Sequence, residues 1–410
     1  MTWEQLRIRL MGLSAYRPLL ETEELSVCAA LLEALYGRDG ERAAACYTRL
    51  FCLLRQGNWS SLGEWMLDQL KYRETPYPIL LAERREDPAL TAAARNDIEV
   101  LTQLCRTDCG CFLDAMSALL PGPDYAAMLD ALPRWESGAP FDFETLTAFY
   151  QANGAGMYAR YRAFLWQNGQ LIPVDDPDCP RPEELFGYTL QRRQVVENTR
   201  SMLEGNLVNN VLLYGNSGTG KSATVKSLLS IPGFEDLRLI QVDKDGLQHL
   251  PQLIRTLAGK RHKFILFIDD LAFDQDDRTY SALKTILEGG LERRPANVAI
   301  YATSNRRHLV RQTFSDRAGD EVDASETIEE KTSLADRFGL RIPYLSLDKG
   351  EYLALVDHLA ADAHLAMEPE TLHRRAMQWE LRHHGRTPRT ARQFIASLFS
   401  DNEIESEKES

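Results

Sequence analysis

The segment GNSGTGKS, at residues 215–222, places three glycines within six positions and ends in a lysine and a hydroxyl side chain. An apolar run, NNVLLYG, leads into it, and a run with helical periodicity, GKSATVKSLLS, follows. The glycines let the backbone bend so that successive N–H groups point into one concave loop, which suits phosphate oxygens. The start of the following helix adds positive partial charge. The sequence therefore predicts a strand, a phosphate-binding loop and a helix.

The segment fits the pattern G-x-x-x-x-G-K-[ST] in full, and this pattern gives its residues individual roles. Lys221 is expected to reach the β- and γ-phosphates of a nucleotide, and the Ser222 hydroxyl is expected to ligate Mg²⁺. A chance glycine-rich turn is the alternative, but it does not explain why strand, loop and helix follow in register. The expected nucleotide-binding residues of the loop are Gly215, Asn216, Ser217, Gly218, Thr219, Gly220, Lys221, Ser222 and Ala223.

A second apolar strand, KFILFI, ends in two adjacent carboxylates, Asp269 and Asp270. Because parallel strands deliver their carboxyl ends to one edge of a sheet, both are expected beside the phosphate loop. Two neighbouring negative charges need a cation, which Mg²⁺ and Lys221 supply. We assign Asp269 to the metal and Asp270 to polarising the attacking water. A helix N-cap or a loop hydrogen bond is the alternative role for Asp270.

Strands and helices alternate from residue 185 onward. Apolar runs such as LRLIQVD, KFILFIDD and NVAIYATSN are separated by helical patterns such as RTYSALKTILEGGL, so an α/β fold with a parallel sheet covered on both faces is predicted. Upstream, apolar residues recur at three- and four-residue steps, which predicts a mostly helical domain. Between them lie an Asn-Gly turn signal and four prolines. The expected parts are an N-terminal helical domain at 1–165, a hairpin and linker at 166–184, a nucleotide-binding core at 185–347, a helical lid at 348–400 and a frayed acidic tail at 401–410.

Composition and charge exclude several classes of protein. The chain has 410 residues, 44% apolar and 26% charged, the balance of a soluble globular protein. No apolar run approaches the roughly 20 residues that cross a bilayer, and the start lacks the pattern of a signal peptide, so we expect a cytoplasmic protein without a membrane partner. The net charge of −13 opposes a broad basic face for nucleic acid.

Seven scattered cysteines indicate reduced thiols rather than a disulfide framework. The tightest group, CRTDCGC at residues 105–111, is interpreted as buried helix cysteines. A metal site is the alternative, but it would need a fourth ligand, and no histidine lies nearby.

The strings YATSN, SLADRFG and GRTPRTARQF follow FIDD in an order that resembles AAA+ ATPases over roughly residues 180–400. Together, NNVLLYGNSGTGKS, FIDDL, ALKTILEGGLERRPANVAIYATSNRRHL and SLADRFGL are similar to one bacterial AAA+ family of unknown function. The resemblance implies ATP and Mg²⁺ as cofactors, ATP hydrolysis, and a homo-oligomeric ring or filament. The segment LFGY, at residues 185–188, matches the segment that packs on adenine, which implies contacts from Phe186 and Tyr188.

The same resemblance gives two further polar residues a role. Asn305 matches the polar sensor that helps to hold the water, with Ser304 as the fallback and a turn residue as the alternative reading. Arg337 matches the arginine finger, which acts on the site of a neighbouring subunit through a planar fork that contacts phosphate oxygens. A surface salt bridge with Asp336 or Asp348 is the alternative for Arg337.

Arg389 matches the sensor of the lid. Thr387 can cap a helix and Pro388 suits the first helical position, so Arg389 falls in the first turn. Arg386 and Arg392 compete with it for this role.

Two features depart from the commoner pattern. Asp270 stands where Glu is commoner, and its oxygens fall about an ångström or more short unless the backbone shifts. An Asp-Asp pair also resembles replication-initiator and helicase-loader ATPases, so slow turnover is expected. The acidic stretch at 313–330 is interpreted as a disordered insertion, with an exposed partner contact as the alternative.

Three functions are compatible with these residues. An oligomeric ATP-hydrolysing motor or switch, with a protein partner bound by the N-terminal domain, is the leading hypothesis. A nucleotide-gated binding module with little hydrolysis is the second, favoured by the Asp pair. A helicase-loader-like nucleic-acid remodeller is the third, indicated by NRRHLVRQ but opposed by the net charge and by the lack of a recognisable DNA-binding motif.

Overall fold

The computed structural model describes residues 2–136, 138, 141–271, 283–284, 286–287, 294–305, 334–383 and 385–408, with side chains described up to residue 399. The chain divides into two compact units, Met1–Arg160 and Tyr161–Ser410. The acidic stretch at 313–330 lies outside the described residues, as does most of the helix expected over 278–291.

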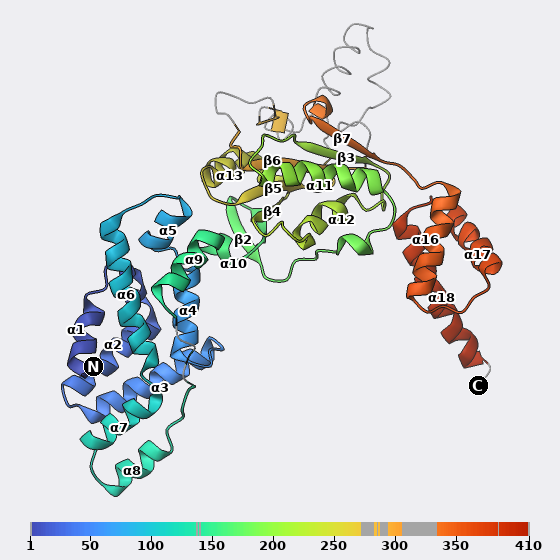
Figure 1. The fold of residues 1–410 in the computed structure, drawn as a ribbon. Coiled ribbons are helices and arrows are strands. Elements are labelled where there is room, and N and C mark those ends of the chain that lie inside the picture. The colour runs from blue at the N-terminus through green and yellow to red at the C-terminus, as the bar shows by residue number, and fades with distance from the viewer. Residues whose placement is uncertain are drawn as a thin grey trace. The chain divides into compact units, whose positions relative to one another are not determined.

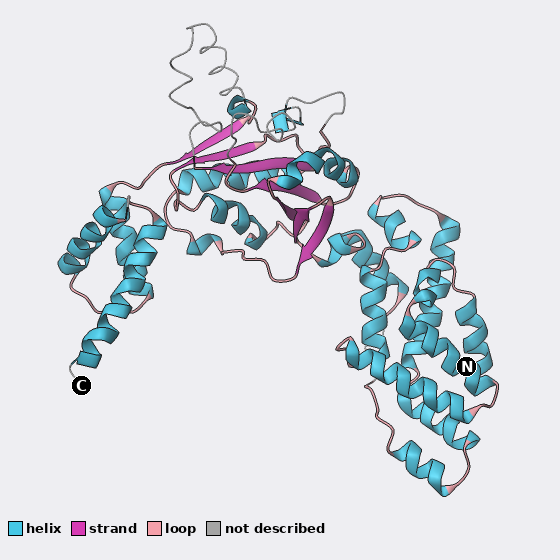
Figure 2. Cartoon of the chain, turned by 180° about the vertical axis from the view of Figure 1, so that it is seen from behind, coloured by secondary structure: helices cyan, strands magenta, loops and turns pink. Residues whose placement is uncertain are grey.

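The first unit is built from helices (Figures 1 and 2), as expected from its periodicity. Polar side chains begin most of them: Thr2, Thr22, Asp39, Ser61, Asp87, Asp108 and Asp142 each accept a backbone N–H from the first turn. The helices are α1 (Trp3–Met11), α2 (Glu23–Tyr36), α3 (Gly40–Gln56), α4 (Leu62–Tyr72), α5 (Pro76–Ala82), α6 (Pro88–Arg106), α7 (Cys109–Leu119), α8 (Pro123–Asp130), α9 (Phe143–Asn153) and α10 (Met157–Arg160), with a 3₁₀ turn at Arg17–Glu21.

One carboxylate fixes the chain between the first two helices of this unit. Asp97, on α6, is fully buried, and its Oδ2 accepts the N–H groups of Ser14 at 2.9 Å and Tyr16 at 3.0 Å. The Tyr16 hydroxyl bonds that of Tyr150 at 3.0 Å, and Tyr150 donates to the Leu70 carbonyl at 2.7 Å. These bonds tie α6, α9 and the segment after α1 into one buried network.

The cysteines of the first unit are thiols of differing exposure. None of the seven cysteines, all of which the structure describes, forms a disulfide. Cys105 and Cys109 are buried, as interpreted from the sequence, whereas Cys111 is exposed. No cluster of three or more His, Cys, Asp or Glu side chains suited to a metal occurs within the described residues.

In the described part of the second unit, seven strands form one sheet in the order β2-β1-β4-β5-β6-β3-β7 (Figure 1). All neighbours are parallel except the hairpin pair β1 and β2. The strands are β1 (Ala163–Gln167), β2 (Gln170–Val174), β3 (Val211–Gly215), β4 (Leu237–Val242), β5 (Lys263–Ile268), β6 (Val298–Ser304) and β7 (Leu340–Tyr344). The helices among them are α11 (Thr189–Leu203), α12 (Lys221–Lys226) and α13 (Leu250–Leu257), with 3₁₀ turns at Pro182–Glu184, Ser227–Ser230 and Asp245–His249.

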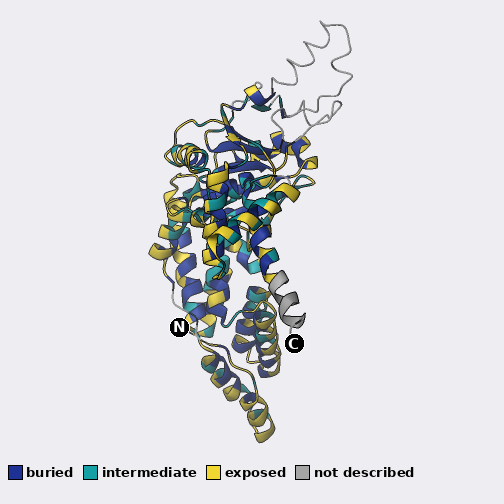
Figure 3. Cartoon of the chain, turned by 90° about the vertical axis from the view of Figure 1, so that its right-hand side faces the viewer, coloured by how far each residue is buried: buried dark blue, intermediate teal, exposed yellow. Residues whose placement is uncertain are grey.

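The central strands are buried along almost their whole length, which explains their continuous apolar sequence (Figure 3). Residues of α11 and α12 share a core with alternate residues of β3, β5 and β6, among them Leu213, Phe267 and Tyr301. Tyr301 is fully buried, and its hydroxyl bonds Thr199 and Asn198, each at 2.8 Å. This network anchors α11 to the sheet.

Two strands differ from the expected organisation. The expected hairpin is present, but it begins at Ala163, before the expected boundary at 166, and β1 pairs in parallel with β4, so the hairpin forms part of the main sheet. Its turn is Asn168-Gly169, both with positive φ. At the opposite edge, β7 was not predicted, because LRIPY is short, interrupted by a proline and buried only at Ile342 and Tyr344.

A small helical lid ends the second unit. It comprises α16 (Lys349–Asp362), α17 (Pro369–Arg382) and α18 (Pro388–Lys408). On α18, Ala391, Phe394, Ile395 and Leu398 fall on one face of the helix and are all buried in the lid core. The α18 backbone continues to Lys408, where a frayed tail was expected from residue 401.

The expected fold class is confirmed in its architecture: a core with a mostly parallel sheet, a small C-terminal helical lid and a helical N-terminal unit. Among the described helices, none combines the length and apolarity that a membrane span requires.

We predict that Asp97→Ala destabilises the first unit by about 3 kcal/mol, because the buried Tyr16 N–H and the part-buried Ser14 N–H both lose their carboxylate acceptor. Chemical denaturation of the full chain, followed by circular dichroism, measures the loss. Asp39→Ala is the matched control: it removes an exposed helix cap in the same unit and should cost only about 1 kcal/mol. Equal losses in the two variants would contradict the role given to Asp97.

Candidate functional site

The phosphate loop begins where β3 meets the end of β7. Gly215 has a φ of 137°, and a Cβ there would lie 2.1 Å from the Tyr344 carbonyl oxygen. The next N–H, of Asn216, donates to that oxygen at 3.0 Å, and the Asn216 amide donates to the Ser346 hydroxyl at 2.6 Å. The first glycine is therefore fixed by close packing against β7.

The middle of the loop contacts the lid directly. The Arg389 N–H, in the first turn of α18, donates to the Gly218 carbonyl at 3.2 Å. A Cβ on Gly218, where φ is 76°, would lie 2.9 Å from the Arg389 Cβ and 3.1 Å from the Thr387 hydroxyl. The pattern G-x-x-x-x-G-K-[ST] allows any residue at position 218, so the pattern does not explain this glycine. The close approach of Arg389 and Thr387 does, because it leaves no room for a side chain.

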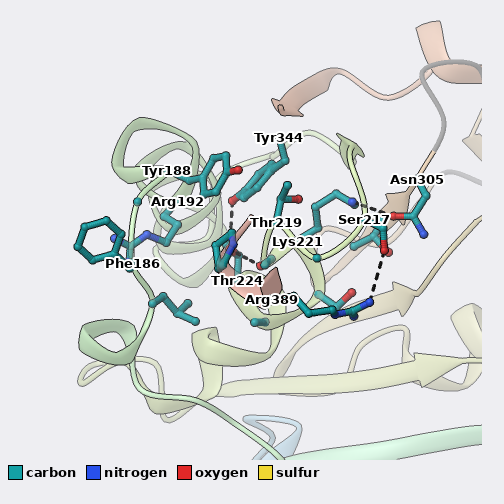
Figure 4. A pocket seen from close by; sticks show the side chains of 18 of the residues that line it. Phe186, Tyr188, Arg192, Ser217, Thr219, Lys221, Thr224, Asn305, Tyr344 and Arg389 are labelled. Atoms are coloured by element: carbon teal, nitrogen blue, oxygen red, sulfur yellow. Dashed lines mark hydrogen bonds between the residues drawn. The ribbon is translucent and has the colours of Figure 1, made fainter. Parts of the chain in front are cut away.

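Lys221 begins α12, and its side chain extends toward the end of β6 (Figure 4). Its Nζ donates to the carbonyls of Gly215 at 3.1 Å and Asn216 at 2.7 Å, and to Asn305 Oδ1 at 2.9 Å. Burial lowers the pKa of Lys221 to about 8. The nearby negative charges of Asp270 and Asp269 act in the other direction and limit the decrease. The ammonium form thus still predominates at neutral pH, held by neutral oxygens.

The two carboxylates at the end of β5 have different surroundings. Asp269 Oδ1 accepts from the hydroxyls of Ser222 at 2.6 Å and Thr303 at 2.5 Å. Asp270 Oδ1 accepts from the Asn305 amide at 2.8 Å. Asp270 also has a φ of 52°, a left-handed conformation that is uncommon for residues other than Gly, Asn and Asp.

A cavity of about 580 Å³ lies among these groups, within the range of about 300–1,000 Å³ for small-molecule sites. It is lined by most of the residues singled out in the sequence: Phe186, Tyr188, Ser217, Gly218, Thr219, Gly220, Lys221, Ser222, Ala223, Asp269, Asp270, Asn305 and Arg389. Gly215, Asn216 and Arg337 lie outside the lining.

Arg337 is half-buried in the turn just before β7. Both acids considered as its alternative partners have other contacts: Asp336 accepts from Arg341 at 2.5 Å, and Asp348 caps α16 through the Glu351 N–H at 2.7 Å. The role of Arg337 at a neighbouring subunit's site stays a prediction.

The three arginines that compete for the lid sensor differ in position. Arg389 lines the cavity and donates to the Ser217 hydroxyl at 3.5 Å (Figure 4). Arg392 also lines it but donates to the Glu184 carbonyl at 3.0 Å, and Arg386 lies outside the lining with its Nε 3.9 Å from Glu380. Of these three interactions, the one made by Arg389 reaches the phosphate loop, at Ser217.

Two aromatic side chains of the LFGY segment connect the core to the lid (Figure 4). Tyr188 stacks on Tyr344 with ring centroids 4.8 Å apart, and its hydroxyl donates to the Leu345 carbonyl at 2.5 Å. Phe186 stacks on His358 of α16 at 5.6 Å. They border the cavity at the end away from Asn305.

Sequence reasoning missed several lining residues, of which Thr303 is the most informative. Thr303 and Asn305 both line the cavity, whereas the fallback Ser304 between them is buried and lies outside the lining. Alternation along β6 would have indicated Thr303, since residues two apart share a face of the sheet. Others, such as Arg192, Thr224 and Tyr344, had no local signal.

The residues present fit the ATP and Mg²⁺ that the sequence resemblance implies. Ser222 and Asp269 offer a hydroxyl and a carboxylate oxygen 2.6 Å apart, and Mg²⁺ prefers such oxygen ligands, with few carboxylates when phosphates complete its coordination. Lys221, Arg389 and the loop N–H groups supply the positive charge that polyphosphate requires.

Comparison with known families supports the sequence resemblance. Residues 159–402 match the model of a family described as "Protein of unknown function (DUF815)". The chain belongs to the DUF815 family. The match covers the sheet, the phosphate loop and the lid of this DUF815 protein.

Solved structures with some likeness to this DUF815 protein include a mutant of Thermotoga maritima RuvB, with 13% identity and a TM-score of 0.38, covering 55% of this chain and 66% of that chain. Another is the Thermotoga maritima RuvB Holliday junction branch migration motor, with 14% identity and a TM-score of 0.35, covering 53% of this chain and 63% of that one. Likeness at this level carries no information on function. No curated protein sequence matches the chain.

We predict that Gly218→Ala displaces the lid, because the new methyl group collides with the Arg389 Cβ. Nucleotide affinity should fall at least about tenfold, equivalent to about 1.4 kcal/mol. Isothermal titration with a slowly hydrolysed ATP analogue measures it.

The matched control is Gly233→Ala. Gly233 also has a left-handed φ, of 87°, but a Cβ there meets no atom within 4 Å. Both variants therefore carry the backbone strain, and only Gly218→Ala adds the collision. If both bind nucleotide equally well, the lid contact does not constrain the loop.

Proposed function

We propose that this DUF815 protein binds ATP with Mg²⁺ and hydrolyses it slowly, as an oligomeric motor or switch. One observation carries the proposal: a lysine, a hydroxyl–carboxylate pair, a second carboxylate and an arginine from the lid converge on one cavity. Lys221, Ser222, Asp269, Asp270 and Arg389 all line it. These are the groups that phosphoryl transfer requires, since its catalysis consists almost entirely of positioning and charge stabilisation.

Lys221 is proposed to exchange its present partners for phosphate oxygens. Its three acceptors here are neutral, two loop carbonyls and the Asn305 amide oxygen. Charge-assisted bonds to phosphate are stronger than bonds to neutral acceptors, so exchange is favourable. Bound Mg²⁺ would supply positive charge beside the phosphates. Ser222 and Asp269 would hold it, and Asn305 would be released to orient water.

Asp270 is proposed as the residue that polarises the attacking water. Its carboxylate accepts from Asn305 at 2.8 Å, so base and sensor are already coupled. An Asp reaches less far than a Glu, and a base placed slightly short of its water is less effective. This supports slow turnover.

A nucleotide-gated binding module with little hydrolysis is the second candidate. It is favoured by the direct bond between the Gly218 carbonyl and the Arg389 N–H, which links the phosphate loop to the lid backbone. A ligand that prefers one arrangement of loop and lid would shift the population of lid positions without hydrolysis. Steady-state phosphate release separates the two candidates.

In either case the helical first unit is proposed to bind a protein partner. Nucleic acid is not favoured as a partner because of the net charge of −13.

Lys221→Ala tests the nucleotide site. Phosphate release should fall at least about a hundredfold, because the main charge at the β- and γ-phosphates is lost. Lys226→Ala is the control: Lys226 lies on the same helix but pairs with Asp178 at 3.2 Å, and its loss should leave release within about twofold. Intact release in purified Lys221→Ala would refute the proposed function.

Arg337→Ala tests the oligomer. We expect nucleotide binding to persist and turnover to fall by at least about a thousandfold, the range of arginine fingers. Arg341→Ala, which removes the exposed arginine paired with Asp336, should leave turnover unchanged.

A mixing experiment makes the trans assignment decisive. Arg337→Ala subunits keep a complete nucleotide site, and Lys221→Ala subunits keep the finger, so mixed oligomers should hydrolyse ATP although neither variant does so alone. A mixture no more active than its components would contradict a finger acting between subunits.

A further inference from the structure

We propose that Thr303 is a positioning residue that holds Asp270 in its left-handed conformation and thereby compensates for the shorter side chain at that position. The inference rests on the proposed ATP hydrolysis and deepens it. It starts from three bonds that one residue of β6 makes to the turn at the end of β5.

Thr303 contacts each residue of that turn. Its Oγ1 donates to Asp269 Oδ1 at 2.5 Å and accepts the Asp270 N–H at 2.9 Å. Its carbonyl accepts the Leu271 N–H at 2.7 Å. A hydroxyl has one proton and two lone pairs, so it can make both side-chain bonds at once. Thr303 itself is only 2% exposed, whereas Asp269 and Asp270 are exposed at the cavity, so these bonds join the buried strand to its solvent-facing end.

The turn held in this way has an unusual backbone. Asp270 has a φ of 52°, where residues with a Cβ rarely lie and where surrounding contacts must maintain the conformation. The bond from its N–H to the Thr303 hydroxyl is one such contact. The Asn305 amide, two residues along the same strand, holds the carboxylate at 2.8 Å. Backbone and side chain of Asp270 are therefore both fixed from β6.

This conformation bears on the reach of Asp270. A straight continuation of β5 would place an Asp carboxylate about one methylene short of where a Glu carboxylate lies. The left-handed conformation of Asp270 changes the direction of the backbone at this residue. It therefore also changes the direction of the Cα–Cβ bond, and so the position of the carboxylate. Thr303 thus sets the geometry of the base through Asp270 and, through Asp269, that of the metal-binding carboxylate.

Thr303→Val provides the test, because valine keeps the β-branched shape but lacks the hydroxyl. The maximal rate of phosphate release should fall at least about tenfold, while affinity for a slowly hydrolysed ATP analogue changes by less than about threefold. Thr303→Ser restores the hydroxyl and should return the rate to within about threefold of wild type. Thr199→Val is the control: it removes another buried hydroxyl of the same unit, bonded to Tyr301, and should leave the rate within about twofold.

A double variant tests the argument about reach. If loss of the Thr303 hydroxyl relaxes the turn, a longer carboxylate should act better there, so Thr303→Val with Asp270→Glu should be faster than Thr303→Val alone. A crystal structure of Thr303→Val gives a readout that does not depend on activity, and we expect the φ of Asp270 to leave the left-handed region.

The outcomes separate this inference from the proposed function. A wild-type protein that neither binds nor hydrolyses ATP refutes the proposed function, and this inference with it. An active wild type with an equally active Thr303→Val overturns the inference alone. So does a Thr303→Val that loses affinity and rate together, or an Asp270→Glu substitution that slows the wild-type and Thr303→Val backgrounds equally.

Discussion

The parallel register of three strands is the constraint on which the rest of the site depends. Tyr214 of β3 lies opposite Ser304 of β6, and Ile268 of β5 lies opposite Ala302. Just beyond these pairs, Asp269 accepts from the Thr303 hydroxyl, and Lys221 donates to both Gly215 and Asn305. A shift of one residue in either pairing would turn these side chains to the opposite face of the sheet. The buried, apolar length of β5 and β6 prevents such a shift, so the core of the sheet fixes the positions of its polar edge.

Charge at this edge is balanced locally, within a chain that is acidic overall. Lys221 lies between the loop carbonyls and Asn305, while Asp269 and Asp270 are each held by uncharged donors. Within the described residues no salt bridge joins the lysine to either acid, although all three side chains line one cavity. A site organised in this way can accept a polyphosphate and a divalent cation together, because each charge it offers meets an opposite charge on the ligand.

The sequence was sufficient for the parts of the site that depend on local pattern. The glycine loop, the strand ending in Asp269 and Asp270, and the capped start of α18 each follow from a few consecutive residues and were assigned correctly as elements. The hairpin's place in the sheet, the edge strand β7 and the lid contact at Gly218 were not foreseen. Each is set by packing between segments far apart in the chain, such as the loop glycine Gly215 against the Tyr344 carbonyl, and no local periodicity records that contact.

The connection from loop to lid favours a switch over a fast motor within the proposed function. Tyr344 at the end of β7 accepts the Asn216 N–H and stacks on Tyr188, so the phosphate loop, the aromatic segment and the lid share contacts. Nucleotide that alters the loop must therefore also alter the contacts of the lid. Asp270 has a shorter side chain than the commoner Glu, which favours slow hydrolysis even with the turn held by Thr303, and slow hydrolysis prolongs the nucleotide-bound arrangement. A long-lived bound state gives a partner time to recognise it, whereas a motor gains from rapid turnover.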